Sequence, residues 1–195
     1  MNKERKILDS ETCPIQVYSL DNRITGLTGI LGLTVAPGVK HEYSTEIWDR
    51  DIDKDLERLQ SYYGIDLLIT LLEEHEFQDL RMFGFIERLQ QYDMDHIWFP
   101  IQDTSVPRNI PRFAKLVTRI IDVLSNGQTV VVHCMAGLGR SGLVAASCLT
   151  ALGFTPAQAI AVVRSVRPGA IDPKEQESFV ATFDSYLRSS VQRKA

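Results

Sequence analysis

The sequence predicts a three-layer α/β domain in which a central, mostly parallel sheet is flanked by helices. Three observations predict it: short apolar runs typical of buried parallel strands, segments between them with apolar residues at helical spacing, and a length of 195 residues with 44% hydrophobic residues. That length and composition suit one domain with its own core. We therefore expect residues 1–195 to form a single domain, with the polar residues 1–14 as a loose N-terminal lead-in.

The apolar runs place the strands, and the spacing of apolar residues places the helices. Strands are predicted at residues 15–20, 29–35, 65–72, 95–100 and 129–133. Helices are predicted over residues 51–63, 77–89 with an interruption near Gly84, 111–124, 143 onward, 156–166 and beyond 172. A capping box with proline at the first helical position marks the start of one helix, at Thr155, Pro156 and Gln158.

Two acidic segments are expected to face solvent. The charges of the helix over residues 51–63 are interpreted as its solvated face, with acids favoured in the first turn. A second cluster, Glu73-Glu74-His75-Glu76, follows the strand at residues 65–72. It has no partner residues at metal-ligand spacing, so we expect a solvated loop rather than a metal site.

The stretch from Thr129 to Gly142 carries the predicted chemistry. It begins with a buried strand, continues as a glycine-rich loop and leads into a helix, and its Cys134 is followed after five residues by Arg140. Loop N–H groups, a helix N-terminus and a guanidinium together hold a tetrahedral oxyanion. The same field favours a thiolate over a thiol. Cys134 is therefore a candidate nucleophile facing a phosphate bound by Met135, Ala136, Gly137, Leu138, Gly139 and Arg140.

The charge distribution supports an anion site in this region. No Asp or Glu occurs from Val123 to Ile171, whereas Arg140, Arg164 and Arg167 lie within that segment. The whole chain carries a net charge of −4. The segment is thus locally positive in an acidic protein.

A dinucleotide-binding loop is the rival interpretation. Residues 137–142 fit the pattern G-x-G-x-x-G between a strand and a helix. That fingerprint also needs an acidic residue about 20 positions further on and a second βαβ half. The first carboxylate after the loop is Asp172, and the segments that follow the loop are predicted as helices. The dinucleotide interpretation is therefore disfavoured.

Asp103 is the candidate general acid. It lies on the loop that follows the strand at residues 95–100. Ligands of α/β sheets bind where such loops leave the carboxyl ends of the strands. The alternative on residues alone is that Asp103 caps a turn or a helix.

Several motifs, taken in order, resemble the cysteine-dependent dual-specificity protein phosphatases, and more narrowly the cyclin-dependent kinase-associated phosphatases. The loop His133-Cys134-x5-Arg140-Ser141 is the most specific of them. The others are Leu31-Gly32-Leu33 with Ala36-Pro37-Gly38, then Phe99-Pro100-Ile101-Gln102-Asp103, then Arg167 with Gly169-Ala170-Ile171 and Gln176.

The resemblance implies a protein-tyrosine-phosphatase-like fold and a two-step phosphoryl transfer without metal or cofactor. In such a reaction Cys134 attacks phosphorus, Arg140 and the loop amides stabilise the oxygens, and Asp103 protonates the leaving hydroxyl. Ser141 can donate a hydrogen bond to the departing sulfur, or cap the helix. Gln176 matches a family glutamine that positions water.

Several neighbouring residues have structural interpretations. His133 precedes the nucleophile on a strand, where adjacent side chains point to opposite faces, so a structural role is favoured over a general base. Arg164 and Arg167 could contact substrate phosphate, although structural pairing is the commoner role. The odd set Cys13, Cys134 and Cys148 argues against disulfides or zinc, and Cys148 is expected in the core.

The expected substrate is a phosphoprotein carrying phosphotyrosine or phosphoserine/phosphothreonine, with a protein kinase as a candidate partner by resemblance. The loop side chains Met135, Ala136 and Leu138 are neutral, whereas phosphoinositide-directed relatives usually carry lysines there. An acidic chain disfavours nucleic acid, and no membrane segment or leader is evident, so we expect a cytoplasmic protein. Alternatives are a phosphoprotein-binding module without turnover, a phosphoinositide phosphatase, or a thiol enzyme of the sulfurtransferase or arsenate-reductase kind.

Overall fold

The computed structural model describes residues 5–192 and contains a five-stranded central sheet. Strand β2 pairs antiparallel with β3, and the other neighbours pair parallel. The α/β class with a mostly parallel sheet is therefore confirmed. The strands in their spatial order are β2 (Tyr18–Leu20), β3 (Ile30–Thr34), β8 (Thr129–His133), β6 (Leu67–Thr70) and β7 (Asp95–Trp98).

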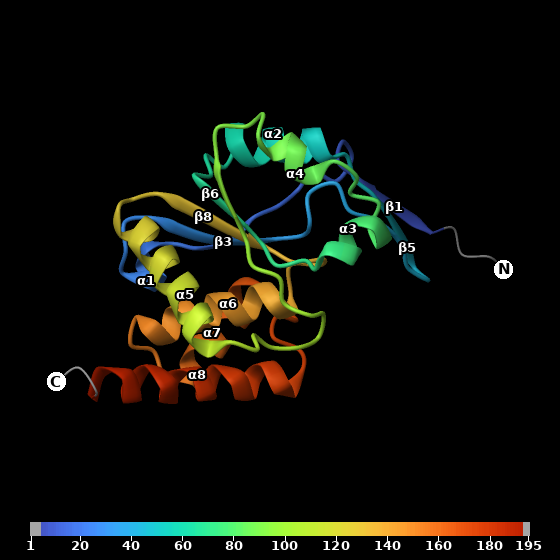
Figure 1. Ribbon diagram of the computed structural model, residues 1–195. Helices are drawn as coiled ribbons and strands as arrows, with labels where there is room; N and C mark the ends of the chain where they lie inside the picture. Colours follow the sequence, from blue (N-terminus) through green and yellow to red (C-terminus); the bar gives the residue numbers. More distant parts are fainter. Residues whose placement is uncertain (1–4, 193–195) are drawn as a thin grey trace.

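Helices cover both faces of this sheet (Figure 1). One face is covered by α5 (Ile110–Ser125), α6 (Gly139–Ala151), α7 (Pro156–Val166) and α8 (Lys174–Gln192). The opposite face is covered by α2 (Ile52–Ser61), α3 (Glu74–Asp79) and α4 (Phe85–Leu89), and a short α1 (Asn22–Thr25) follows β2. The interruption predicted near Gly84 is the break between α3 and α4, where Gly84 has a φ of 72°.

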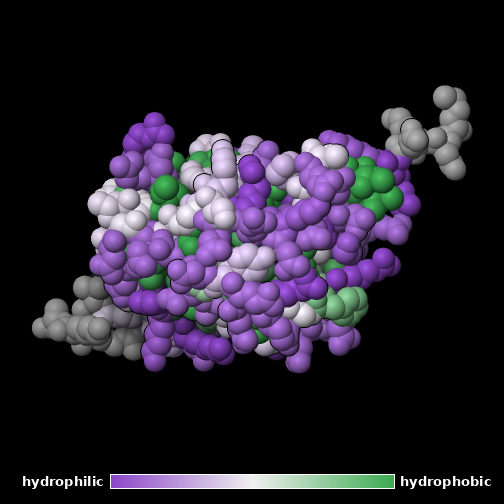
Figure 2. Space-filling view, turned by 90° about the horizontal axis from the view of Figure 1, so that it is seen from above, coloured by the Kyte–Doolittle hydropathy of each residue, from purple (hydrophilic) through white to green (hydrophobic). Residues whose placement is uncertain are grey.

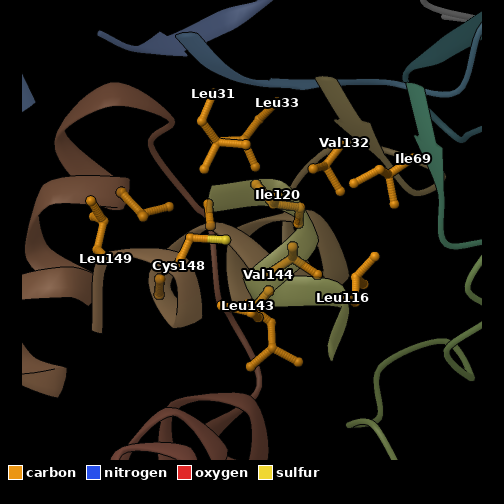
Figure 3. Packing of buried hydrophobic residues seen from close by; sticks show 14 of the residues in the cluster. Leu31, Leu33, Ile69, Leu116, Ile120, Val132, Leu143, Val144, Cys148 and Leu149 are labelled. Carbon is orange, nitrogen blue, oxygen red and sulfur yellow. The ribbon is translucent and has the colours of Figure 1, made fainter. Parts of the chain in front are cut away.

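The alternation of β8 divides the core into two layers. Val130 and Val132 pack toward α5 and α6, whereas Val131 packs with the side chains of α2 and α4. All three valines are fully buried. Cys148 lies in the first of these layers, among Leu31, Ile120 and Leu149 (Figure 3), as predicted. Its burial raises the pKa of the thiol, as expected for an inert core cysteine.

A small second sheet corrects the prediction for residues 1–14. Strand β1 (Lys6–Asp9) pairs parallel with β5 (Glu46–Asp49), which pairs antiparallel with β4 (Lys40–Glu42). The lead-in is therefore not loose over residues 6–9, because their backbone completes a three-stranded sheet; residues 1–4 lie outside the described part. A strand of four residues has too short a pattern to be recognised in the sequence.

Two other expectations were wrong in part. Helix α6 begins at Gly139 rather than near Leu143, so Arg140 and Ser141 lie in its first turn. Asp55 of α2 is not on a solvated face: it is 1% exposed and accepts hydrogen bonds from Arg50 Nε and Nη2, each at 2.8 Å, and from Gly38 N at 2.9 Å. Asp55 thus joins α2 to the turn that follows β3 through Gly38, and to the residue after β5 through Arg50.

The face seen in Figure 2 is mostly hydrophilic, with smaller hydrophobic groups between the polar side chains. Among residues 5–192, no helix combines the length and hydrophobicity needed to cross a bilayer.

Candidate active site

The loop after β8 holds Cys134 at the carboxyl end of the central strand. Cys134 is 4% exposed, so its thiol is recessed below the surface. The loop carbonyls are bound by the surrounding protein: Ala36 N donates to Met135 O at 2.9 Å, and Arg167 donates to Ala136 O at 2.9 Å. With these carbonyls bound, the N–H groups are the loop's available polar groups.

Gly137 is required by the loop's close approach to β3. Its φ is 66°, and a Cβ atom there would lie 2.3 Å from the carbonyl oxygen of Thr34. Only glycine adopts this conformation without strain and fits this space. Gly139 likewise leaves room for a close neighbour, because a Cβ atom there would lie 3.0 Å from Gln176 Oε1. The glycines that resembled a dinucleotide fingerprint thus let the loop pack against β3 and the Gln176 amide.

Arg140 is held under the loop by a bidentate ion pair with Glu76. The distances are 2.6 Å from Nη1 to Oε2 and 2.8 Å from Nη2 to Oε1, and Nη1 also donates to Ile101 O at 3.0 Å. Burial alone would lower the pKa of Arg140, but the Glu76 hydrogen bonds and the charges of Cys134, Glu76 and Asp103 raise it. Arg140 is 1% exposed, and its Nε has no hydrogen-bond partner among the described residues.

Glu76 is the site residue that the sequence interpretation missed. The segment expected as a solvated loop forms helix α3, and Glu76 is 8% exposed because its carboxylate turns inward to Arg140. It also accepts a hydrogen bond from Glu73 N at 2.8 Å, as part of a capping box. One signal was available: the segment follows a buried parallel strand at the same edge as Cys134, where ligand-binding loops gather.

Asp103 and Gln176 face the same cavity as Cys134 and Arg140. This cavity has a volume of about 240 Å³, and it is also lined by Met135, Ala136 and Gly139. The Asp103 side chain is 64% exposed at the rim, with Oδ1 3.0 Å from Arg140 Nη2. Gln176 is fully buried; its Nε2 donates to Ser105 O at 3.0 Å, and its Oε1 has no partner among the described residues. The structure therefore places four predicted site residues around one cavity: Cys134, Arg140, Asp103 and Gln176.

Three other predicted site residues lie close by without lining the cavity. Gly137 and Leu138 are in the loop but turn their carbonyls to Arg167 and Gly142, respectively. Ser141 is fully buried in the first turn of α6, and its Oγ has no hydrogen-bond partner among the described residues. Ser141 therefore lies outside the cavity lining, and a contact between its hydroxyl and the reacting sulfur stays a prediction.

Both nearby arginines have structural partners. Arg164 pairs with Glu177 and donates to the carbonyls of Ala170 and Ile171. Arg167 donates to the loop carbonyls, and its guanidinium lies 4.1 Å from the ring centroid of Tyr18. Arg167 therefore stabilises the loop after β8 through its carbonyl groups.

His133 lies on the opposite side of the sheet from Cys134, in a chain of hydrogen bonds. Its Nδ1 lies 3.2 Å from Cys134 O, its Nε2 lies 2.8 Å from Thr70 Oγ1, and His96 Nε2 lies 2.9 Å from the same hydroxyl. A carbonyl only accepts, so Nδ1 carries the proton and Nε2 accepts from Thr70, which in turn accepts from His96. This arrangement positions the Cys134 backbone and leaves His133 no role as a base.

His133 should make folding stability depend on pH. Burial lowers its pKa from 6.5 to about 3, so the folded protein holds it neutral while the unfolded chain binds a proton below pH 6.5. The free energy of unfolding therefore has its full value above that pH and falls as the pH drops toward 3, by up to about 1.4 kcal/mol per pH unit. Urea denaturation between pH 7 and pH 4 measures this. A His133→Asn variant should have a shallower slope, and an identical slope would contradict the assignment.

The chain is similar to known proteins over most of its length. The family model described as Cyclin-dependent kinase inhibitor 3 (CDKN3) matches residues 2–160. The chain belongs to the cyclin-dependent kinase inhibitor 3 family. A rat protein named cyclin-dependent kinase inhibitor 3 is 33% identical over 182 residues, covering 92% of this chain and 83% of the relative. The human protein of that name is 29% identical over 189 residues, covering 95% and 86%.

Solved structures agree with this family assignment. A crystal structure of kinase associated phosphatase, in which serine replaces the catalytic-site cysteine, has a TM-score of 0.82 and 29% identity, covering 91% of this chain and 98% of that one. A dual specificity protein phosphatase from human, CDC14C, is 33% identical over 96 residues, which are 48% of this chain and 20% of the relative. This member of the CDKN3 family is a cysteine-dependent, dual-specificity protein phosphatase, as the sequence predicted.

Proposed function

We propose that the cavity at Cys134 hydrolyses phosphate monoesters on proteins through a cysteinyl-phosphate intermediate. One observation carries this proposal: a recessed thiol, a carboxyl group and a buried guanidinium line a single cavity, and the guanidinium Nε has no partner among the described residues. A phosphate oxygen in the cavity would supply the missing acceptor, which a buried N–H requires.

In the first step Cys134 Sγ attacks phosphorus opposite the departing oxygen. Arg140 and the N–H groups of residues 135–140 bind the equatorial oxygens as charge develops on them. The phosphate displaces Asp103 from its ion pair with Arg140, and the released carboxylate takes up a proton from solvent. Asp103 then donates this proton to the leaving oxygen. The P–O bond breaks, the P–S bond forms, and the alcohol leaves neutral.

In the second step water attacks the phosphocysteine. Asp103, now ionised, takes a proton from that water by microscopic reversibility. Gln176 Oε1 is the acceptor available to orient the water, since its Nε2 is already bound to Ser105 O. Ser141 Oγ donates to the sulfur as it leaves as a thiolate.

The proposed substrate is a phosphoprotein, with a protein kinase as its candidate identity. Apart from Arg140, the cavity lining contains no Lys or Arg, and it includes Asp103 and Asp172. Such a rim does not favour a substrate with several phosphates, such as a phosphoinositide. The names of the relatives support a kinase as partner. We further propose a cytoplasmic protein of one domain over residues 1–195, with no nucleic-acid or membrane partner.

The Asp103→Asn variant should slow substrates in proportion to how poor their leaving group is. An amide cannot supply the proton, so phosphothreonine hydrolysis should fall by about 10²- to 10⁴-fold, while an aryl ester with an acidic phenol should be less affected. Steady-state kinetics on both esters measure the difference. Equal slowing of the two would remove Asp103 from the acid role.

The proposed function is tested by turnover in EDTA and reductant. Matched phosphotyrosine and phosphothreonine peptides and a phosphoinositide serve as substrates. Peptide hydrolysis that orthovanadate inhibits is the expected result. No turnover of any ester, with phosphopeptide binding intact, would instead favour a binding module.

A further inference from the structure

Four exposed cationic side chains lie along helix α5 and the residues just before it. Arg112, Lys115 and Arg119 follow one another on α5 at intervals of three and four residues, which place them on one side of the helix. Arg108 lies two residues before the first residue of α5. We call these four residues the basic stripe.

The basic stripe has no carboxylate partner within the described chain. Within residues 5–192, none of its four cations forms an ion pair. By contrast, the exposed cations Arg23, Lys54 and Arg188 each pair with a carboxylate. Carboxylates are not scarce, since the whole chain carries a net charge of −4. The basic stripe is therefore an uncompensated positive surface on an acidic protein.

The charges of α5 do not stabilise the helix itself. Arg112 lies in the first turn, where the helix dipole favours carboxylates. Asp122 is the helix's single carboxylate, and it lies in the last turn, where the dipole favours cations. Like charges three and four residues apart also repel one another. The arrangement therefore points to a partner outside the chain rather than to a contribution to folding.

The N-terminal end of the basic stripe reaches the loop that carries the general acid. A pocket of about 230 Å³ at this end is lined by Arg108, Arg112 and one carboxylate, Glu73. Arg108 Nη2 donates to Gln102 Oε1 at 2.8 Å, and Gln102 directly precedes Asp103. Since Asp103 lines the catalytic cavity, a chain bound along the stripe would pass the rim of that cavity.

We propose that the basic stripe binds an acidic segment of the phosphoprotein substrate and thereby guides the phosphorylated residue to Cys134. The inference rests on the proposed function of the catalytic cavity. Arg112 and Arg119 are separated by about 10 Å along the helix axis, at 1.5 Å per residue, which is the length of about three extended residues. Complementary charges at the rim of an interface speed association and fix the register of the bound chain.

The surroundings of the basic stripe favour a protein segment over a nucleic acid or a membrane. Carboxylates lie at both of its ends, Glu73 in the pocket and Asp122 in the last turn of α5. Nucleic acids and acidic membranes present wide arrays of phosphates, which these carboxylates and the net charge of −4 would repel. A short acidic peptide can contact the line of cations alone.

The test uses pairs of phosphopeptides that share the phosphorylated residue and differ only in a run of three glutamates or three glutamines. Each run is placed on the N-terminal side in one pair and on the C-terminal side in another. At an ionic strength of about 0.05 M, one of the glutamate peptides should have a kcat/KM roughly tenfold above that of its glutamine partner, mainly through KM. This ratio should fall toward one at about 0.5 M salt, because salt screens exposed charges.

A variant of the basic stripe tests the residues themselves. Arg112→Gln, Lys115→Gln and Arg119→Gln together remove the charges while keeping good helix formers, and should bring the ratio close to one. A matched control makes the same change of net charge by glutamine substitutions at three exposed cations on other helices: Arg23, Lys54 and Arg188. This control should keep the wild-type ratio.

A wild-type ratio near one, or a ratio that the stripe variant leaves unchanged, would overturn the docking role. Weaker binding of that variant to vesicles containing a phosphoinositide, with the peptide ratio unchanged, would assign the stripe to a membrane instead. Failure of the proposed function would be seen separately, as a wild type that hydrolyses none of the peptides. Fluorescence anisotropy of the same peptides on the Cys134→Ser protein would still test the stripe, with tighter binding of a glutamate peptide as the expected result.

Discussion

Replacing Cys134 with serine should abolish phosphatase turnover, lowering kcat by at least about 10⁴-fold. A serine hydroxyl is not ionised near pH 7, so it is a far weaker nucleophile than a thiolate. The exchange changes one atom of a 4%-exposed side chain and leaves the Arg140–Glu76 pair and the Arg167 contacts to the loop in place. Phosphopeptide binding should therefore survive, as measured by calorimetry next to steady-state kinetics.

Cys148→Ala is the control for this variant. Cys148 is a fully buried residue of α6 that packs in the core and does not line the cavity. Its loss removes a cysteine without touching the site, so the variant should keep its activity. A Cys134→Ser protein as active as the wild type would refute the nucleophile assignment.

The Glu76→Ala variant should lose both stability and activity. Arg140 is 1% exposed, and Glu76 supplies two of its hydrogen bonds. Removing one partner of a buried ion pair leaves the other charge uncompensated and costs about 3–5 kcal/mol of unfolding free energy. The guanidinium would also lose two of the contacts that fix its orientation in the cavity lining, so kcat should fall as well.

Urea denaturation and kinetics on the same preparations test this second prediction. Glu74→Ala is the matched control, because Glu74 lies in the same first turn of α3 and is exposed. Glu76→Gln keeps an acceptor of similar size and should fall between the wild type and Glu76→Ala. If Glu76→Ala behaved like Glu74→Ala in both measurements, the pair would have no energetic role.

The elements that the sequence predicted well are those with strong periodic patterns. The valine run of β8 and the apolar stripe of α5 occur where expected, because one buried face of each determines its residue types. The small sheet was not predictable in this way. Strands β1, β4 and β5 have three or four residues each and are half exposed, so they leave no clear alternation.

In the candidate site, too, the residues that lie in local sequence motifs were predicted and the others were not. Cys134, Arg140 and Asp103 lie in local motifs whose chemistry depends on spacing along the chain, and the structure brings them into one cavity. Glu76 and Tyr43 reach that cavity from separate elements, by contacts across 64 residues to Arg140 and 92 residues to Met135. Contacts between residues so far apart in the sequence leave no local pattern from which they could be predicted. The charge of Glu76 also favoured the prediction that its side chain faces solvent.

Direct detection of the cysteinyl-phosphate tests the central claim most closely. The wild type would be mixed with a phosphotyrosine peptide, quenched in acid within milliseconds and digested, and the Cys134 peptide analysed by mass spectrometry. Asp103→Asn offers a second background for the same trap. We expect one phosphoryl group on Cys134 that disappears as free phosphate forms. Rapid phosphate release with no phosphate on Cys134 in either protein would contradict the account.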